Sequence, residues 1–324
     1  MQLRRLGRTG RELSPIGLGC MQFSNTGAAG RFYRATAQDT ATAIVRAALD
    51  GGVTWFDTAE MYGGGHSERA LTTALREHGV KPGEVAIATK WQPVGRTARS
   101  IPATIGDRLA ALQDFPIDLH QIHMPHGSLS SIPAQVKAMA RLQTDGKVSA
   151  VGVSNFSAAQ MRRAAAVLEG EGLALASNQI QLNLLHRNAE TDGVLAAARD
   201  LGVTLIAFSP LRSGLLTGKF HDDPERLKQV LPIRRWIGGF GPRAVERTRP
   251  LIDELTAIGR AHGASPSQIA LAWLLAYYGD TVVAIPGASR PEQAAELAAA
   301  AELRLTDAET AALDAHSREA TASR

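Results

Sequence analysis

Residues 53–62 read Val-Thr-Trp-Phe-Asp-Thr-Ala-Glu-Met-Tyr. Their pattern, an apolar run followed by polar side chains, is the one by which other strands of the chain are identified. The apolar and β-branched residues that precede Asp57 predict a short buried strand. This strand ends in a carboxylate, and the loop that follows it carries the phenol of Tyr62. One predicted strand end therefore delivers two side chains that can take part in proton chemistry.

Two later stretches follow the same plan. Residues 85–90, Val-Ala-Ile-Ala-Thr-Lys, predict a second strand that ends at Lys90. Residues 117–123, Ile-Asp-Leu-His-Gln-Ile-His, predict a third strand that ends at His123. An acid, a phenol, an ammonium and an imidazole thus lie at or just beyond the ends of three apolar strands.

Short apolar runs alternate with helical periodicity along the whole chain. A hairpin is predicted within residues 1–15. Eight further strands are predicted at residues 16–20, 53–57, 85–89, 117–122, 148–153, 177–181, 203–208 and 281–285. Helices are predicted at residues 38–51, from an N-cap at Ser67 to Gly79, and at residues 101–113, 133–145, 157–169, 189–201, 246–262, 266–277, 291–301 and 306–318.

Strands that alternate with helices predict an α/β fold with a parallel sheet and right-handed crossovers. Eight such units favour a closed (β/α)8 TIM barrel with an N-terminal hairpin and extra helices after strand 7 and at the C-terminus. An open dinucleotide-binding sheet would carry Gly-x-Gly-x-x-Gly after its first strand, and neither residues 17–19 nor residues 63–65 complete that pattern. Residues 1–324 are expected to form a single barrel domain, with its chemistry at the carboxyl ends of the strands.

Composition narrows the class of protein. Hydrophobic residues make up 44% of the 324 residues and charged residues 20%, which is typical of a globular chain with a large core. The net charge of +4 is small and the arginines are dispersed among acids, so nucleic acid is not expected as a partner. Cys20 is the one cysteine, which excludes an intrachain disulfide and favours a reducing compartment. With no apolar run near the length of a membrane span, a soluble, cytoplasmic protein is expected.

Residues 209–245 are rich in glycine and proline and predict an irregular, lid-like connection. The densest basic run, residues 226–249, overlaps this segment. It is interpreted as a solvated surface, with the alternative that one arginine meets an anionic ligand.

Eight motifs share an order and spacing that resemble the aldo-keto reductase superfamily, and the resemblance covers nearly the whole chain. They are residues 56–63 (Phe-Asp-Thr-Ala-Glu-Met-Tyr-Gly), 88–90, 118–123, 152–156 (Gly-Val-Ser-Asn-Phe), 178–179, 207–211, 214–219 and 285–289.

The resemblance implies that Asp57, Tyr62, Lys90 and His123 form a catalytic tetrad that reduces a carbonyl group. Such a reduction leaves negative charge on the carbonyl oxygen, so a donor must supply a proton there. Tyr62 is the implied acid. A free phenol has a pKa near ~10; the ammonium of Lys90 would lower it, and Asp57 would hold that ammonium in place. His123 would orient the carbonyl or assist the proton transfer.

The resemblance also implies a nicotinamide cofactor, NADPH (NADP+), with NADH possible. Ser289 and Arg290 could meet the adenosine 2′-phosphate, whereas Gly287 and Gln293 stand where some branches carry basic residues. The implied cofactor-binding residues are Gly19, Cys20, Met21, Asp57, Ser154, Asn155, Gln179, Phe208, Ser209, Pro210, Leu211, Ser213, Gly214, Lys219, Ile285, Gly287, Ser289, Arg290, Gln293 and Glu296.

The expected partner is a small carbonyl substrate. Aromatic residues on loops near the barrel mouth predict an apolar pocket above the tetrad. They are Phe23, Trp91 and Trp236, with Phe32 and Phe240 on the same loops. The short polar tail after residue 318 favours a relatively open pocket, and the sequence does not indicate an oligomeric state.

Two other functions remain open. A Schiff-base aldolase could use Lys90 as a nucleophile, although a neighbouring carboxylate would keep the amine protonated. A redox-sensing module that holds the cofactor for a partner protein would carry the same residues. A metal site built from His120, His123 and His126 is not expected, because strand alternation sends His120 and His123 to opposite faces.

Overall fold

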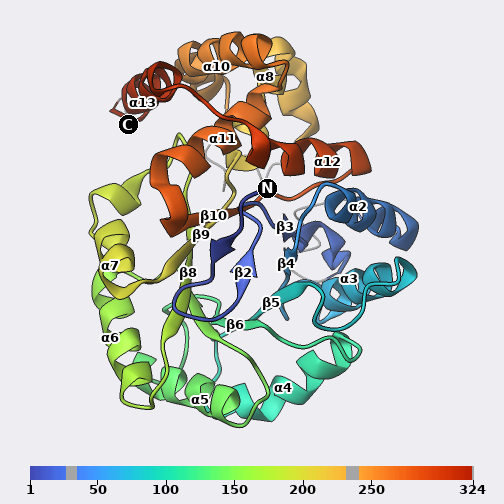
Figure 1. The fold of residues 1–324 in the computed structure, drawn as a ribbon, viewed down its shortest axis with the longest axis vertical. Helices are drawn as coiled ribbons and strands as arrows, with labels where there is room; N and C mark the ends of the chain where they lie inside the picture. Colours follow the sequence, from blue (N-terminus) through green and yellow to red (C-terminus); the bar gives the residue numbers. More distant parts are fainter. Residues whose placement is uncertain (27–34, 231–240, 323–324) are drawn as a thin grey trace.

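The computed structural model describes residues 1–26, 35–230 and 241–322, and within them a parallel sheet of eight strands forms the centre of the molecule (Figure 1). Strands that are neighbours in the sheet follow one another in the sequence. This order is that of repeated strand–helix–strand units. The strands are β3 (Leu18–Gly19), β4 (Trp55–Asp57), β5 (Ala86–Trp91), β6 (Leu119–Ile122), β7 (Val151–Ser154), β8 (Leu175–Gln181), β9 (Thr204–Phe208) and β10 (Val282–Ile285).

The sheet closes between β3 and β10. The backbone N–H of Gly17 donates to the carbonyl of Ala284 at 2.8 Å, and that of Gly19 donates to Pro286 at 3.0 Å. A parallel bridge also joins Gly19 to Gly287. The predicted (β/α)8 barrel is therefore confirmed, and the carboxyl ends of these strands meet at one mouth.

A hairpin fills the opposite end of the barrel. β1 (Arg4–Arg5) pairs antiparallel with β2 (Glu12–Leu13), as predicted, and lies across the strands in Figure 1. Leu6 and Leu13 join the inward side chains of the barrel in one buried cluster, together with Trp55, Ala86, Ala88, Leu119, Ala150, Ala176, Ile206, Val283 and Ile285. The hairpin plugs the amino end with apolar side chains and leaves the carboxyl-end mouth to the loops.

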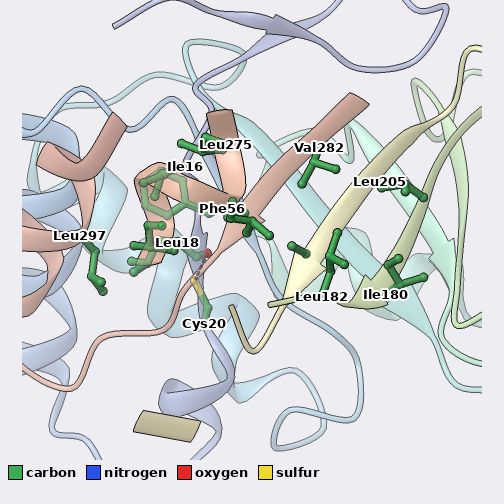
Figure 2. Close-up of a cluster of buried hydrophobic side chains, with 14 of the residues drawn as sticks. Ile16, Leu18, Cys20, Phe56, Ile180, Leu182, Leu205, Leu275, Val282 and Leu297 are labelled. Atoms are coloured by element: carbon green, nitrogen blue, oxygen red, sulfur yellow. Dashed lines mark hydrogen bonds between the residues drawn. The ribbon is translucent and has the colours of Figure 1, made fainter. Parts of the chain in front are cut away.

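Helices surround the barrel (Figure 1), and a second, larger core fills the layer between helices and strands. Figure 2 shows part of this core, in which Ile16, Leu18 and Phe56 gather near Leu275. The helices are α2 (Gln38–Asp50), α3 (His66–Glu77), α4 (Ser100–Ala111), α5 (Ile132–Thr144), α6 (Ala158–Glu169), α7 (Val194–Leu201), α8 (Lys219–Asp222), α10 (Pro242–His262), α11 (Pro266–Tyr278), α12 (Pro291–Ala299) and α13 (Asp307–Ala322). The 3-10 turns are η1 (Met21–Ser24), η2 (Asn188–Glu190), η3 (Arg212–Thr217), η4 (Pro224–Gln229), η5 (Gly279–Thr281) and η6 (Ala300–Glu302).

The extra helices lie where the sequence places them. α10 follows β9, packs against α8, α11 and α13, and forms with them a group beyond one side of the ring in Figure 1. The predicted lid-like connection is only partly irregular, since η3, α8 and η4 occupy much of it. Residues 231–240 lie outside the described part of the chain.

Two local predictions were wrong. Ser67 does not cap α3: Gly65 stands at that N-cap, and the Ser67 hydroxyl instead donates to the carbonyl of Cys20 at 2.7 Å. The helix predicted at 189–201 begins only at Val194, because the 3-10 turn η2 and the left-handed Gly193 precede it. Among the described residues, no helix has both the length and the apolar character that a membrane span requires.

Candidate active site

A buried ion pair lies at the mouth of the barrel. Asp57 is the last residue of β4, and Lys90 is next to last in the adjacent strand β5. The Lys90 ammonium contacts Oδ1 of Asp57 and donates to the carbonyl of Thr58 at 2.9 Å. Lys90 is 0% exposed and Asp57 is 2% exposed. Two charges this deep are tolerated only because each satisfies the other.

The second oxygen of this carboxylate is held by two amides. Gln179 in β8 donates from Nε2 to Oδ2 of Asp57 at 2.8 Å, and Gln121 in β6 donates to the same oxygen at 3.2 Å. A bond between β4 and β8 spans the barrel interior. No role was predicted for Gln121 from the sequence, although it is the register partner of Lys90 on the next strand. Both oxygens of Asp57 are thus fixed in direction.

Tyr62 and His123 lie together above this pair. Their ring centroids are 6.0 Å apart in an edge-to-face arrangement, and the Lys90 ammonium lies 5.2 Å from the centroid of the Tyr62 ring. Burial alone would lower the pKa of Lys90, but the charge of Asp57, the phenol of Tyr62 and hydrogen bonds to both hold that pKa above its usual value. Lys90 is therefore an ammonium at neutral pH, beside the phenol.

His123 is neutral at physiological pH. Burial, and then the charge of Lys90, lower the pKa of this imidazole to about 3. Its Nδ1 has no hydrogen-bond partner within the residues that the structure describes. A neutral imidazole can donate one hydrogen bond to a ligand oxygen without bringing a second positive charge next to Lys90.

A cavity of about 540 Å³ opens above Tyr62 and His123. Its wall includes Asp57 and every predicted cofactor-binding residue except Arg290, which lies at the exposed N-cap of α12. Lys90 is buried and does not reach this wall. Lining residues to which the sequence assigned no role are Gln22, Met61, Met124, Thr217, Ser267, Pro286 and Leu297. Most of them adjoin a predicted site residue in the chain, which is the signal that could have found them.

Two aromatic residues predicted for the substrate pocket lie elsewhere. Phe23 and Trp91 are each 1% exposed, belong to the outer hydrophobic core and are absent from the cavity wall. The Trp91 indole donates to the hydroxyl of Ser100 at 3.1 Å, which turns it towards α4. Neither side chain presents surface to a ligand. Trp236, like Phe32 and Phe240, lies outside the described residues.

Several residues around the cavity have positive φ angles, a backbone conformation that residues other than glycine rarely adopt. Asn155, Ser209 and Ser213 have φ values of 59°, 49° and 53° and all three line the cavity. Gly287 lies so close to Gln22 that a Cβ on it would come within 1.9 Å of the Gln22 amide nitrogen. Residues with such strained backbone conformations concentrate at ligand sites. Because a side chain at position 287 would clash with Gln22, only the backbone of Gly287 can form the cavity wall there.

Amide and hydroxyl groups gather where β7 and β8 end. The Ser154 hydroxyl donates to the carbonyl of Gln179 at 2.9 Å, and Asn155 donates from Nδ2 to that hydroxyl at 3.0 Å. Phe208 ends the next strand and lines the same cavity. A flat aromatic ligand that carries a carboxamide would find hydrogen-bonding groups and a stacking surface here.

Comparisons with known proteins agree with this geometry. The sequence model of the Aldo/keto reductase family matches residues 15–318. The chain belongs to the aldo/keto reductase family. It is 39% identical over 305 residues to a protein of Mycobacterium tuberculosis (strain H37Rv) named an uncharacterized oxidoreductase, covering 91% of this chain and 86% of that one.

Two solved aldo/keto reductase-like structures share the fold. The glycerol dehydrogenase AKR11B4 of Gluconobacter oxydans superposes with a TM-score of 0.79 at 30% identity, over 98% of this chain and 95% of that chain. A thermostable aldo-keto reductase in complex with the inhibitor epalrestat gives a TM-score of 0.77 at 29% identity, over 98% and 100% of the two chains. This aldo/keto reductase is therefore an oxidoreductase, of a family that generally uses nicotinamide cofactors.

His120 of this aldo/keto reductase is buried away from the cavity. Its side chain is 1% exposed, and the described residues contain no group of three potential metal ligands. Burial, with a smaller contribution from the charge of Arg108, lowers the pKa of His120 to about 4. The folded protein therefore keeps this imidazole neutral under conditions in which the unfolded chain protonates it.

This difference predicts an acid-dependent loss of stability. Because the unfolded histidine has a pKa near ~6.5, its contribution is fully present above about pH 6.5 and is lost as the pH falls towards about 4. The expected slope is up to about 1.4 kcal/mol of unfolding free energy per pH unit. Denaturant unfolding at about pH 7 and about pH 5 should show a smaller pH dependence in His120→Asn than in the wild type. Identical pH dependences would contradict the assignment.

Proposed function

We propose that this protein reduces an aldehyde or ketone to an alcohol with NADPH, and that Tyr62 is the proton donor. One observation carries the proposal: a buried ammonium contacts both a carboxylate and a phenol beneath a cavity whose wall also holds amide groups. A phenol in contact with an ammonium is a better proton donor than a free one, because the ammonium stabilises the phenolate.

In this proposal the bound dihydronicotinamide supplies the hydride, and the chain's own residues manage the carbonyl oxygen. Tyr62 donates its proton to that oxygen as negative charge develops there. Lys90 stabilises the resulting phenolate, and Asp57 keeps Lys90 charged and in place. His123, neutral, donates a hydrogen bond that turns the carbonyl oxygen towards Tyr62. The carbonyl oxygen then has Tyr62 and His123 as hydrogen-bond donors, and the phenolate of Tyr62 has Lys90 as its counterion.

The residues also suit the proposed cofactor. Ser154, Asn155 and Gln179 offer hydrogen bonds to a carboxamide, and Phe208 offers a face for stacking. The N-terminus of α12, with Ser289 on the cavity wall and Arg290 beside it, offers a helix dipole and a guanidinium to a phosphate. These groups favour NADPH over NADH.

A Schiff-base mechanism finds less support. The raised pKa of Lys90 removes the amine lone pair at neutral pH, and the side chain is 0% exposed, so a carbonyl carbon cannot approach it. The structural neighbour named a glycerol dehydrogenase supports interconversion of an alcohol and a carbonyl instead.

The test is a fluorescence titration with NADPH and NADH, followed by turnover with a panel of aliphatic and aromatic aldehydes and ketones. We expect NADPH to bind at least about tenfold more tightly, the effect of about one charge-assisted hydrogen bond. We also expect loss of nicotinamide absorbance that requires both enzyme and carbonyl. Tight NADPH binding without turnover on any carbonyl would favour the redox-sensing function, and no binding of either nucleotide would overturn the proposal.

A further inference from the structure

The loops that carry Tyr62 and His123 are both bonded to Arg96, the first through the side chain of Arg96 and the second through its backbone carbonyl. Its Nη1 lies 2.5 Å from Oε1 of Glu60, and Nη2 donates to the Thr104 hydroxyl at 2.8 Å. Its Nε donates to the hydroxyl of Ser100 at 3.1 Å. The guanidinium also packs over the Trp91 ring, 5.3 Å from the centroid. Together these contacts hold the side chain in a single orientation.

Glu60, the acidic partner, lies between two site residues, three positions after Asp57 and two before Tyr62. Its backbone N–H donates to the carbonyl of Lys90 at 3.2 Å, and its Oε1 also accepts from the backbone N–H of Gln92. The loop that presents Tyr62 is therefore bound to the end of β5 through both backbone and side chain.

The backbone of Arg96 holds the other loop. Its carbonyl accepts from the N–H of Leu129 and from the hydroxyl of Ser128, both at 2.9 Å. Next to it, the N–H of Gly95 donates to the carbonyl of Gly127 at 2.8 Å. The segment that begins at His123 and leads to α5 is thus paired with the loop of Arg96.

We propose that Arg96, with Glu60, is a positioning residue that sets the placement of Tyr62 relative to His123. Neither side chain lines the cavity, so neither touches the reacting atoms. Their effect is to fix three consecutive strand-to-helix loops so that the phenol and the imidazole point at one oxygen. The inference rests on the proposed carbonyl reduction, because misplacement of catalytic groups by about 1 Å can cost ~10²-fold in rate.

A merely structural ion pair would behave differently. The side chains are 26% and 12% exposed, and partly exposed pairs contribute little to stability. If Arg96 positions the two loops, its replacement should lower kcat strongly while it lowers the free energy of unfolding only slightly. Arg162 provides a control ion pair, since it contacts Asp200 at 2.6 Å, both side chains are about half exposed, and neither lines the cavity.

The experiment compares Arg96→Met, Arg96→Lys and Glu60→Gln with Arg162→Met in two measurements. Hydrogen exchange of residues 58–65 and 123–131 reports loop order whether or not turnover is detected. Steady-state kinetics report kcat and KM. We expect faster exchange in both loops and a kcat about 10- to 100-fold lower in Arg96→Met, with NADPH affinity within about twofold. Arg96→Lys should recover part of kcat, and Arg162→Met should match the wild type.

Unchanged exchange in Arg96→Met, or faster exchange with kcat unchanged, would overturn the positioning role. If Arg96→Met fails to fold, Glu60→Gln decides by the same criteria, since it keeps the shape of the side chain and removes its charge. Absence of turnover in the wild type would overturn the proposed function instead, while the exchange data would still decide whether Arg96 orders the two loops.

Discussion

Replacement of Tyr62 by phenylalanine is expected to lower kcat by about 10²- to 10⁴-fold or more, because it removes the proposed proton donor. The phenyl ring keeps its edge-to-face contact with His123, so the cavity should retain its shape. Lys90 keeps Asp57 as its counterion and stays charged. The measurement is the steady-state rate with the best carbonyl substrate, at saturating NADPH.

Two controls test whether the loss of kcat comes from the missing proton donor. NADPH affinity, measured by fluorescence, should stay within about twofold of the wild type, since proton donation and cofactor binding use different groups. Tyr277→Phe removes a phenol whose oxygen accepts a hydrogen bond from Arg318 and which does not line the cavity, so it should leave kcat unchanged. Retention of more than about a tenth of wild-type kcat in Tyr62→Phe would argue against a tyrosine acid.

The barrel could be predicted because its strands are buried on both faces. Such strands have continuous apolar sequences. The run from Val203 to Phe208 therefore predicts a strand that differs from the observed β9 by one residue at its start. Parallel strands also share a direction, which brings residues from separate carboxyl ends to one mouth. For this reason the proximity of Asp57, Lys90 and His123 followed from three local patterns.

Other features depend on contacts that no local pattern encodes. Phe23 and Trp91 were predicted on loops, but Phe23 lies in η1 and Trp91 ends β5, and packing turns both side chains into the outer core. Gln121 lies in a motif that the sequence singled out, but its bond to Asp57 depends on barrel curvature. The sequence assigned no role to Arg96, because its partners are spread over residues 60–104.

Replacement of Lys90 by methionine is expected to destabilise the fold and to abolish turnover together. Methionine has a similar length and no charge, so among the described residues it leaves the Asp57 carboxylate, at 2% exposure, with the side-chain amides of Gln121 and Gln179 as its remaining partners. Removing one partner of a buried ion pair costs about 3–5 kcal/mol. Denaturant unfolding at neutral pH should show a loss of this size, and Tyr62 without its ammonium should be a poorer acid.

The double variant Asp57→Asn with Lys90→Met separates the loss of stability from the loss of turnover. With both charges gone, no uncompensated ion remains in the barrel, so most of the lost free energy of unfolding should return. The asparagine side chain introduced at position 57 would still offer an oxygen to the amides of Gln121 and Gln179. Turnover should not return, because the phenol of Tyr62 still lacks a cation. If the double variant is as unstable as the sum of the single variants, the two charges act independently, and the coupling on which the proposed role of Lys90 depends is absent.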